Sequence, residues 1–558
     1  MARFNQRGTR PAVYSPVTTT GERTRTHEGA TGYLRDARSE LFLLSVSNFV
    51  GQDAFYEKGG DRDDRYTQLV RQLAVEDPAW TVGLLGWLRG EGNMRTAAIV
   101  GAAEFVKARL DATAVGDLVP DARAEGVNGG GWNRQVIDAV LQRPDEPGEL
   151  LGYWTSRYGR KLPKPVKRGI ADAVQRLYNG KSLLKYDTAS KGYRFGDILN
   201  LVHAAPDPGK PWQGELFQYA LDRRHHADAA VPPESNKTLT AHRELMALPV
   251  EQRRAVVTAA DGAERLAAAG MTWEALAGWL QGPMDKAAWE AVIPSMGVMA
   301  LARNLRNFDE AGVSDTVAAQ ICTRFADPKQ VAKSRMFPFR WWAAYKHAPS
   351  LRWAHALEQA LTHSLVNVPQ LSGHTLILVD RSPSMFPGYG FSTPNTSDIP
   401  LAEQAAVFGS ALAMRAQQPT LVEFGGSSKT IDVPRGGSVL RLIEKYSRND
   451  GTDIPSAIKQ HFDLLRHNRI VIVTDEQTRP GWLPSNMERY GGMRETAIDD
   501  LVPTTVPVYL WNLAGYKAGA MPSGTTGRHC FGGLTDQAFR MVPLLESGRD
   551  AAWPWETR

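Results

Sequence analysis

The chain has 558 residues, more than one hydrophobic core normally serves, so we expect at least two domains. Hydrophobic residues make up 42% of the chain and charged residues 22%, a composition that excludes a wholly disordered protein. The net charge of +5 and the isoelectric point of about 9.0 are compatible with a nucleic-acid partner but do not establish one.

The chain carries two cysteines, Cys322 and Cys530, which exclude a disulfide framework and have no CxxC zinc spacing. The first residues are basic but lack the apolar stretch of a signal peptide, and no apolar run is long enough to span a bilayer. We therefore expect a cytoplasmic protein that has no membrane partner. Residues 1–30 are predicted to form a flexible tail.

Between residues 31 and 365 the dominant pattern is the amphipathic helix. One stretch has apolar residues at positions i, i+3, i+4 and i+7: Tyr66, Leu69, Val70 and Leu73. The pair Asp77-Pro78 then predicts the cap and first residue of the next helix. Similar stretches follow, punctuated by proline or glycine, which favours an α-solenoid of HEAT-like repeats. The alternative is an irregular helical domain without repeats.

A basic segment lies within this region, at residues 157–194, where only Asp172 and Asp187 oppose its many cations. Its charge excess is larger than that of the whole chain, so the positive potential is concentrated here. Such cations suit binding to phosphates. Eight are candidate RNA contacts: Arg160, Lys161, Lys164, Lys167, Arg168, Lys185, Lys191 and Arg194.

Aromatic residues alternate with these cations and offer stacking surfaces for unpaired bases. They are Tyr153, Trp154, Tyr158, Tyr178, Tyr186 and Tyr193. The alternative is a solvated helix face whose aromatic residues belong to the core. The residues alone leave these two interpretations about equally supported.

From about residue 366 the pattern changes to alternating strands and helices. Compact apolar runs at 372–380, 419–426, 467–475 and 506–515 predict strands, with helical stretches between them. This alternation predicts an α/β domain with a parallel, doubly wound sheet. Ligands of such sheets bind at the carboxyl ends of the strands.

Oxygen-bearing side chains gather at those predicted strand ends. Asp380, Ser382 and Ser384 form a D-x-S-x-S sequence after one strand, Thr452 precedes a helix, and Asp475 ends another strand. Carboxylate and hydroxyl oxygens suit Mg²⁺ better than zinc or copper. The spacing therefore predicts a magnesium site at one edge of the sheet.

This set of five residues resembles the metal-ion-dependent adhesion site of von Willebrand A domains. The resemblance implies that Ser382 and Ser384 ligate the ion directly, together with either Thr452 or Asp475. It implies that Asp380 acts largely through water and orients the serines. Such a site leaves one metal position open for a partner's carboxylate, which makes an acidic protein ligand one implied partner. A purely structural ion is the alternative.

Nearly the whole chain, apart from its first 40 residues, is similar to the Ro autoantigen family, in which a TROVE module precedes a von Willebrand A domain. In the C-terminal half the similarity rests on DRSPSM, GTDIPSAI and VIVTDEQT. In the helical half it rests on LKYDTASKGYRFGDILNLVHAAP, MGVMALARNLRNF and KSRMFPFRWWAAYK. It implies a TROVE domain at 31–365, a ring of HEAT-like helices that is closed by an A domain at 366–558. The Ala- and Arg-rich composition points to a GC-rich bacterial or phage genome.

The resemblance also implies a function without catalysis. A single-stranded 3′ end of a misfolded RNA would enter the central hole, and a noncoding Y-like RNA would bind the basic outer surface. Lys185, Lys191 and His203 would contact RNA, and Arg303 and Arg306 would line the hole. An implied protein partner is a 3′-to-5′ exoribonuclease such as polynucleotide phosphorylase.

Two other functions remain open. The chain is an Mg²⁺-dependent protein-interaction module if the helices serve only as a scaffold. A Mg²⁺-dependent nuclease is less favoured, because two-metal phosphoryl chemistry usually needs several clustered carboxylates and this set offers only Asp380 and Asp475.

Overall fold

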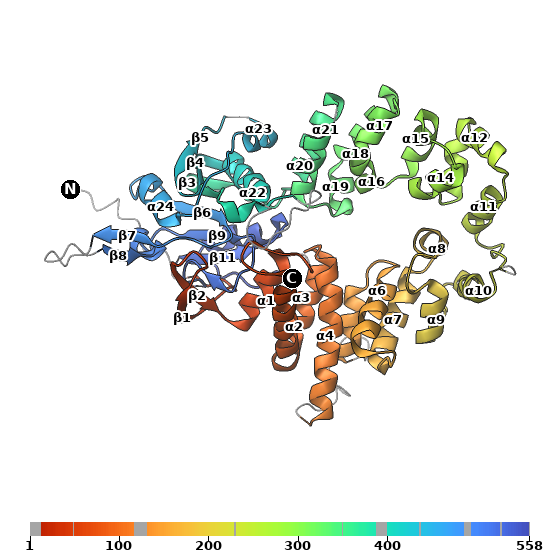
Figure 1. Ribbon diagram of the computed structural model, residues 1–558, viewed down its shortest axis with the longest axis horizontal. Helices are drawn as coiled ribbons and strands as arrows, with labels where there is room; N and C mark the ends of the chain where they lie inside the picture. Colours follow the sequence, from red (N-terminus) through yellow and green to blue (C-terminus); the bar gives the residue numbers. More distant parts are fainter. Residues whose placement is uncertain are drawn as a thin grey trace.

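The computed structural model describes residues 13–47, 50–116, 131–227, 230–348, 350–386, 399–434, 437–484, 493–524 and 527–556. It combines a long arc of helices with a six-stranded mixed sheet (Figure 1). None of the helices in these ranges has both the length and the apolar character needed to cross a bilayer.

The expectation of a mostly helical first part is confirmed. The helices are α1 (Ala37–Ser47), α2 (Gly59–Glu76), α3 (Pro78–Gly90), α4 (Arg95–Ala114), α5 (Trp132–Val140), α6 (Glu146–Tyr158), α7 (Lys164–Leu177), α8 (Gly180–Tyr186), α9 (Phe195–Val202), α10 (Trp212–His225), α11 (Lys237–Met246), α12 (Val250–Thr258), α13 (Gly262–Ala268), α14 (Trp273–Leu280), α15 (Lys286–Val292), α16 (Val298–Arg303), α17 (Leu305–Glu310), α18 (Asp315–Phe325), α19 (Pro328–Ser334), α20 (Pro338–His347) and α21 (Ala354–His363).

Local sequence accounts for the way these helices begin and pack. The side chain of Asp77 accepts a hydrogen bond from the Trp80 amide at 3.2 Å, and Pro78 is the first residue of α3, as predicted. On α2, Tyr66 and Val70 are buried on the predicted apolar face. The 3.6-residue period therefore identified both the helix and the side that packs.

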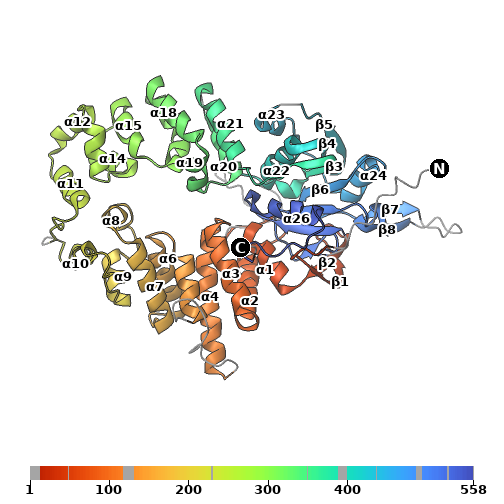
Figure 2. The same cartoon turned by 180° about the vertical axis from the view of Figure 1, so that it is seen from behind.

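The helices follow an arc that leaves the sheet at α1–α4 and returns to it at α20 and α21 (Figures 1 and 2). At the returning end, α20 packs against α22 (Leu401–Arg415) of the sheet domain. The two ends of the arc also touch each other. The guanidinium of Arg335, after α19, lies 3.2 Å from the Gln142 side-chain oxygen and 3.5 Å from the Arg89 carbonyl.

The sheet has the strand order β11-β9-β6-β3-β4-β5. Its strands are β3 (Leu371–Asp380), β4 (Ala416–Phe424), β5 (Ser428–Ile431), β6 (Arg469–Thr474), β9 (Val508–Asn512) and β11 (Arg528–Gly532). The predicted strands are confirmed, and all pair in parallel except β5, which is an antiparallel edge strand. β6 and β9 are buried at every residue, which explains their continuous apolar sequences.

Shorter elements complete this domain. They are the helices α23 (Val439–Ile443), α24 (Ile454–His461), α25 (Ile498–Leu501) and α26 (Met541–Glu546) and the antiparallel pair β7 (Gly481–Pro484) and β8 (Met493–Thr496). The helix α24 ends at His461, six residues before His467. Beyond it, the Nδ1 of His467 accepts a hydrogen bond from the Asp463 amide, which stabilises a turn.

The N-terminal segment differs from the predicted flexible tail over residues 1–30. Residues 1–12 lie outside the described ranges, but Thr19–Arg25 forms strand β1. It pairs with β2 (Thr31–Arg35), which pairs in turn with β10 (Ala518–Gly519). Residues 13–35 therefore pack with the C-terminal domain, and a boundary at residue 30 does not separate two structural units.

The end of the chain binds the start of the arc. The Trp553 and Trp555 rings pack against Phe42 of α1 and Trp80 of α3. The Trp555 ring occupies the space that a Cβ would need at Gly83, so a larger residue at this position of α3 would displace it. Segments from both ends of the chain thus join the arc to the sheet domain.

Candidate metal site and basic surface

The five predicted metal ligands lie at the carboxyl edge of the sheet. Asp380 is the last residue of β3, and Asp475 follows β6, the parallel neighbour of β3, with Val379 paired to Val473. The ends of adjacent parallel strands meet at the same edge, so the two carboxylates face one site. Both are fully buried.

The serines are held by a short turn after β3. The Ser382 amide donates to the Asp380 carboxylate at 2.8 Å, and the Ser382 and Ser384 hydroxyl oxygens lie 3.1 Å apart. Residues Pro383–Met385 form a 3₁₀ turn, and both serine side chains are buried. The D-x-S-x-S spacing therefore brings a carboxylate and two hydroxyls together, as predicted.

Thr452 reaches the same edge on the loop that precedes α24. Its carbonyl accepts from the Arg479 amide at 2.9 Å, which joins this loop to the loop after β6. The Asn449 amide donates to the Arg381 carbonyl at 3.0 Å, which joins it to the serine turn. Thr452 is buried between these two loops.

The electrostatics of the site fit a cation. Burial raises the pKa of Asp475, and the nearby charge of Asp380 raises it further. Burial also raises the pKa of Asp380, while hydrogen bonds from Ser382 and Thr474 oppose that rise. Among the described residues, Oδ2 of Asp475 has no hydrogen-bond partner although it is buried. Two adjacent carboxylates, one of which has an unpartnered buried oxygen, and three hydroxyls form a donor set that fits Mg²⁺.

Sequence reasoning missed the residues that support this site. The Thr474 hydroxyl donates to the Asp380 carboxylate at 2.5 Å. Glu476 has a positive φ of 67° and is buried in an ion pair with Arg35 of β2. The Asn512 amide group donates to the Glu476 carboxylate at 2.8 Å. Thr474 was detectable as the polar end of an apolar strand, but nothing local links Arg35 to a residue 441 positions later.

The turn between β1 and β2 also lies at this edge of the sheet. The Thr26 hydroxyl donates to the Thr478 carbonyl, and the His27 amide donates to the Gln477 side chain, each at 2.8 Å. Glu28 pairs with Arg479 at 3.1 Å. The N-terminal segment therefore borders the loop that carries Asp475.

The basic segment places five cations together around the start of α7. This group, called the α7 cluster below, consists of Arg160, Lys161, Lys164, Lys167 and Arg168. All are exposed except Lys167, which is half-buried. Within the described part of the chain, none of the five has a carboxylate within ion-pairing distance, and the first turn of α7 contains no acidic residue. The positive end of the helix dipole disfavours cations at such a position, so the cluster is electrostatically suited to an anion.

The other candidate RNA contacts in this region differ in exposure and in whether their charge is paired with a carboxylate. Lys185, Lys191 and His203 are exposed, and the Lys191 ammonium lies 3.8 Å from the Asp145 carboxylate. Arg194, in contrast, is paired with the buried carboxylate of Asp187 at 2.8 Å and caps the start of α9. Arg194 thus has a structural partner that the sequence did not indicate.

The aromatic residues of the segment mostly belong to the core. Trp154 and Tyr178 are buried, and Tyr178 stacks on Phe195 at 3.7 Å. The Tyr153 and Tyr158 hydroxyls both donate to the buried carboxylate of Glu104. These four are therefore not open stacking surfaces, whereas Tyr186 and Tyr193 border a pocket.

The last two candidates lie on the returning limb of the arc. Arg303 and Arg306 are exposed, on α16 and α17. Arg306 pairs with Glu310 at 2.9 Å on its own helix. Asp309, an acidic residue of α17 close to both in sequence, pairs instead with Arg352 at 2.6 Å.

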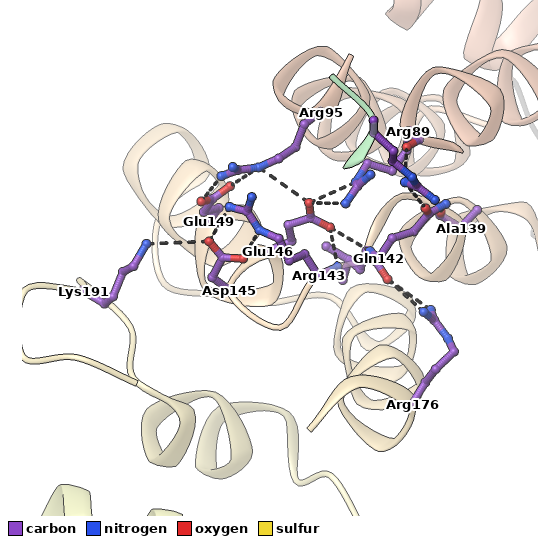
Figure 3. Close-up of polar contacts among 12 residues, drawn as sticks. Arg89, Arg95, Ala139, Gln142, Arg143, Asp145, Glu146, Glu149, Arg176 and Lys191 are labelled. Carbon is purple, nitrogen blue, oxygen red and sulfur yellow. Dashed lines mark hydrogen bonds and ion pairs between the residues drawn. The ribbon is translucent and has the colours of Figure 1, made fainter. Parts of the chain in front are cut away.

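A buried network of ion pairs and hydrogen bonds connects α3 with the start of α6, the helix that leads into the basic segment (Figure 3). Arg89 of α3 donates two hydrogen bonds to Glu146 of α6, at 2.9 and 2.7 Å, and both side chains are almost fully buried. Glu146 also accepts from the amides of Gln142 and Arg143, at 2.7 and 2.8 Å. The network fixes the start of α6 relative to α3.

The comparisons with known proteins bear on the helical arc. Residues 269–349 match the TROVE domain. The TROVE match spans α14–α20, the returning limb that carries Arg303 and Arg306, and the basic segment lies outside it. No curated protein matches the chain in sequence.

The arrangement as a whole is similar to a solved structure. The crystal structure of the Deinococcus radiodurans RO (RSR) protein superposes with a TM-score of 0.54 at 17% sequence identity. The match covers 89% of this chain and 96% of that protein. At this identity the likeness shows a shared fold, which includes the helical arc and the sheet domain.

Proposed function

We propose that this chain is an RNA-binding scaffold of the Ro type. The observation that carries the proposal is the α7 cluster, five cations at the positive end of a helix that have no acidic partner among the described residues. The TROVE match and the Ro-like fold support it independently. Phosphate contacts supply most of the affinity of such surfaces and make it strongly dependent on salt.

The proposal assigns two RNA-binding regions. The helical arc closes on the sheet domain as a ring of HEAT-like helices, and its interior takes the single-stranded 3′ end of a misfolded RNA. Arg303 and Arg306 line this interior. The α7 cluster, Lys185, Lys191 and His203 bind Y-like RNA or the duplex next to the tail, and an exoribonuclease such as polynucleotide phosphorylase degrades the RNA presented.

The sheet domain is, in this proposal, a von Willebrand A domain that holds Mg²⁺. Ser382 and Ser384 would hold the ion, together with either Thr452 or Asp475, and Asp380 would orient the serines. The ion would supply a hard cation for a partner's carboxylate or fix the loops as a structural element. The buried, unpartnered oxygen of Asp475 supports a bound cation rather than an apolar core at this position.

A gel-shift titration tests the proposed RNA-binding mode. A structured RNA with a single-stranded 3′ tail is compared with the same RNA without the tail, at two salt concentrations. We expect the tailed RNA to bind more tightly and both affinities to fall steeply with salt. Equal, salt-insensitive binding of both RNAs would contradict the proposal.

The alternative is that the chain binds proteins through the metal edge and does not bind RNA. One feature favours it: the edge is already bordered by the chain's own Glu28, so acidic side chains are accommodated there. Absence of RNA binding at low salt would move this alternative to first place. A nuclease is the remaining alternative, and it would need several clustered carboxylates. Among the described residues, no cluster of three or more His, Cys, Asp or Glu side chains is placed to hold a metal.

A further inference from the structure

A small pocket lies between α6 and the segment that runs from the end of α8 to α9. Its volume is about 210 Å³, and its lining is mainly apolar. Pockets for drug-sized ligands measure about 300–1,000 Å³, so this one suits a single ring system. We call it the α6 pocket; its lining includes Gly148, Glu149, Gly152, Tyr186, Lys191 and Tyr193.

Two glycines one helical turn apart shape this pocket. A Cβ at Gly148 would lie 3.2 Å from the Tyr193 carbonyl, so the glycine allows the 186–193 segment to approach α6 closely. A Cβ at Gly152 would meet no atom within 4 Å. The space above Gly152 is therefore open, in the middle of a helix where glycine is otherwise unfavourable by about 1 kcal/mol relative to alanine.

Aromatic and cationic groups surround the open space. The Tyr186 ring lies 5.2 Å from the Lys185 ammonium and 5.7 Å from the Arg143 guanidinium. Tyr193 is held against α6, because its hydroxyl donates to the Thr155 hydroxyl at 3.0 Å. Lys191 remains 41% exposed at the rim and points toward Asp145 (Figure 3).

The polar group that can specify a ligand is Glu149. Arg95 binds both of its carboxylate oxygens, one through Nε at 3.1 Å and the other through a terminal guanidinium nitrogen, but the side chain is still 32% exposed. A carboxylate has about four lone-pair sites, so it can accept further hydrogen bonds from an N–H donor. Asp145 is likewise bound at both oxygens, by Arg143, but it is almost fully buried and so cannot accept further hydrogen bonds from a ligand.

From these features we propose that the α6 pocket takes one unpaired nucleobase that carries an exocyclic amino group. The base stacks on Tyr186 or Tyr193, its amino group donates to Glu149, and Lys185 and Lys191 bind the flanking phosphates. Adenine, guanine and cytosine have such an amino group, whereas uracil does not. This inference rests on the proposed RNA-binding function and adds a base-selective site to it.

The test uses an oligoribonucleotide that is abasic except at its central position, which carries cytosine, uracil or no base. Binding is measured by fluorescence anisotropy for the wild type, Gly152→Leu and Gly278→Leu. The leucine side chain introduced by Gly152→Leu would fill the pocket without helix strain, since leucine is a better helix former than glycine. Gly278 of α14 is the matched control, because it is also helical and a Cβ there would also meet nothing within 4 Å.

The wild type should bind the cytosine strand about tenfold more tightly than the fully abasic strand, with the uracil strand weaker than cytosine. Gly152→Leu should bind all three alike, at the affinity of the abasic strand, while Gly278→Leu behaves as the wild type. Unchanged cytosine preference in Gly152→Leu would overturn the pocket assignment. Salt-dependent binding without any base preference would also overturn it but leave the RNA-binding function intact. No binding of any strand at low salt would overturn both.

Discussion

The hydroxyl oxygens of Ser382 and Ser384 lie 3.1 Å apart, in a buried turn directly after Asp380. Two hydroxyls so close to two buried carboxylates form the oxygen-rich donor set that we propose holds Mg²⁺. In this proposal, metal binding is linked to the stability of the sheet domain.

Metal binding should raise thermal stability. Added Mg²⁺ at about 100 times its Kd is expected to increase the free energy of unfolding by about 2.7 kcal/mol relative to EDTA-treated protein. Ser384→Ala should lose this increment. Asp475→Asn should lose it too, but should be more stable than the wild type in EDTA: burial and Asp380 raise the pKa of Asp475, so folding must protonate this carboxyl or bury its charge, and asparagine has neither cost. Differential scanning fluorimetry with and without Mg²⁺ measures both effects.

Ser410→Ala provides the matched control, since Ser410 is a buried serine of α22 away from the strand ends. It should keep the full Mg²⁺ increment. An increment in Ser384→Ala equal to that of the wild type would exclude this serine as a ligand.

Glu146 should be one of the most sensitive positions in the helical arc. Glu146→Ala would leave Arg89 buried without its carboxylate and remove the acceptor of two backbone amides. Breaking a buried pair in this way typically costs about 3–5 kcal/mol. Urea denaturation followed by circular dichroism should show a loss of this size. The exposed Glu310→Ala, which breaks the Arg306 pair, should cost less than about 1 kcal/mol.

His529 should make the protein less stable in mild acid. Burial, together with the nearby charge of Arg528, lowers the pKa of His529 to about 4, against about 6.5 in an unfolded chain. Between these values the unfolded state binds a proton that the folded state does not. The free energy of unfolding therefore falls as the pH falls from about 6.5 toward 4, by about 2 kcal/mol between pH 7 and pH 5.

The variant His529→Asn should reduce this pH dependence, because asparagine preserves a polar contact to Ser15 without titrating. The exposed His355→Asn is the control and should retain the wild-type profile. If His529→Asn and the wild type lose the same stability between pH 7 and pH 5, another group is responsible.

The strands and the candidate ligand set could be predicted because both depend on the order of neighbouring residues in the sequence. One apolar run ends at Asp380, and another ends just before Asp475. Each run predicts a strand, and the polar residue at its end therefore lies at the edge of the sheet. The parallel pairing of these two strands then brings the carboxylates together.

Contacts between distant segments could not be predicted in this way. The pairing of β2 with β10 and the ion pair of Arg35 with Glu476 join residues more than 400 positions apart. Neither periodicity nor charge spacing contains that information. Arg194 is a different case, because its buried partner Asp187 lies only seven residues earlier but looked like an ordinary acidic residue of a basic segment.

The aromatic residues show why composition alone is ambiguous. Trp154 and Tyr178 have the sequence spacing expected either of stacking residues or of a helical core. Their burial follows from helix packing around α6, α7 and α9, which brings Tyr178 onto Phe195. The cations next to them remain exposed, so a basic surface is present. Most of the aromatic residues that we expected to stack on bases there are packed into the helices instead.

The most direct test of the RNA-binding claim is a salt titration of RNA affinity for two double charge reversals. Lys164→Glu/Arg168→Glu alters one face of the α7 cluster, and Arg265→Glu/Lys329→Glu changes the net charge equally at exposed sites elsewhere on the arc. We expect the first variant to bind a 3′-tailed RNA far more weakly, and the slope of log affinity against log salt to shrink by about two. The second variant should differ little from the wild type. Equal loss in both variants, or no loss in the first, would contradict the assignment of the α7 cluster as the RNA-binding surface.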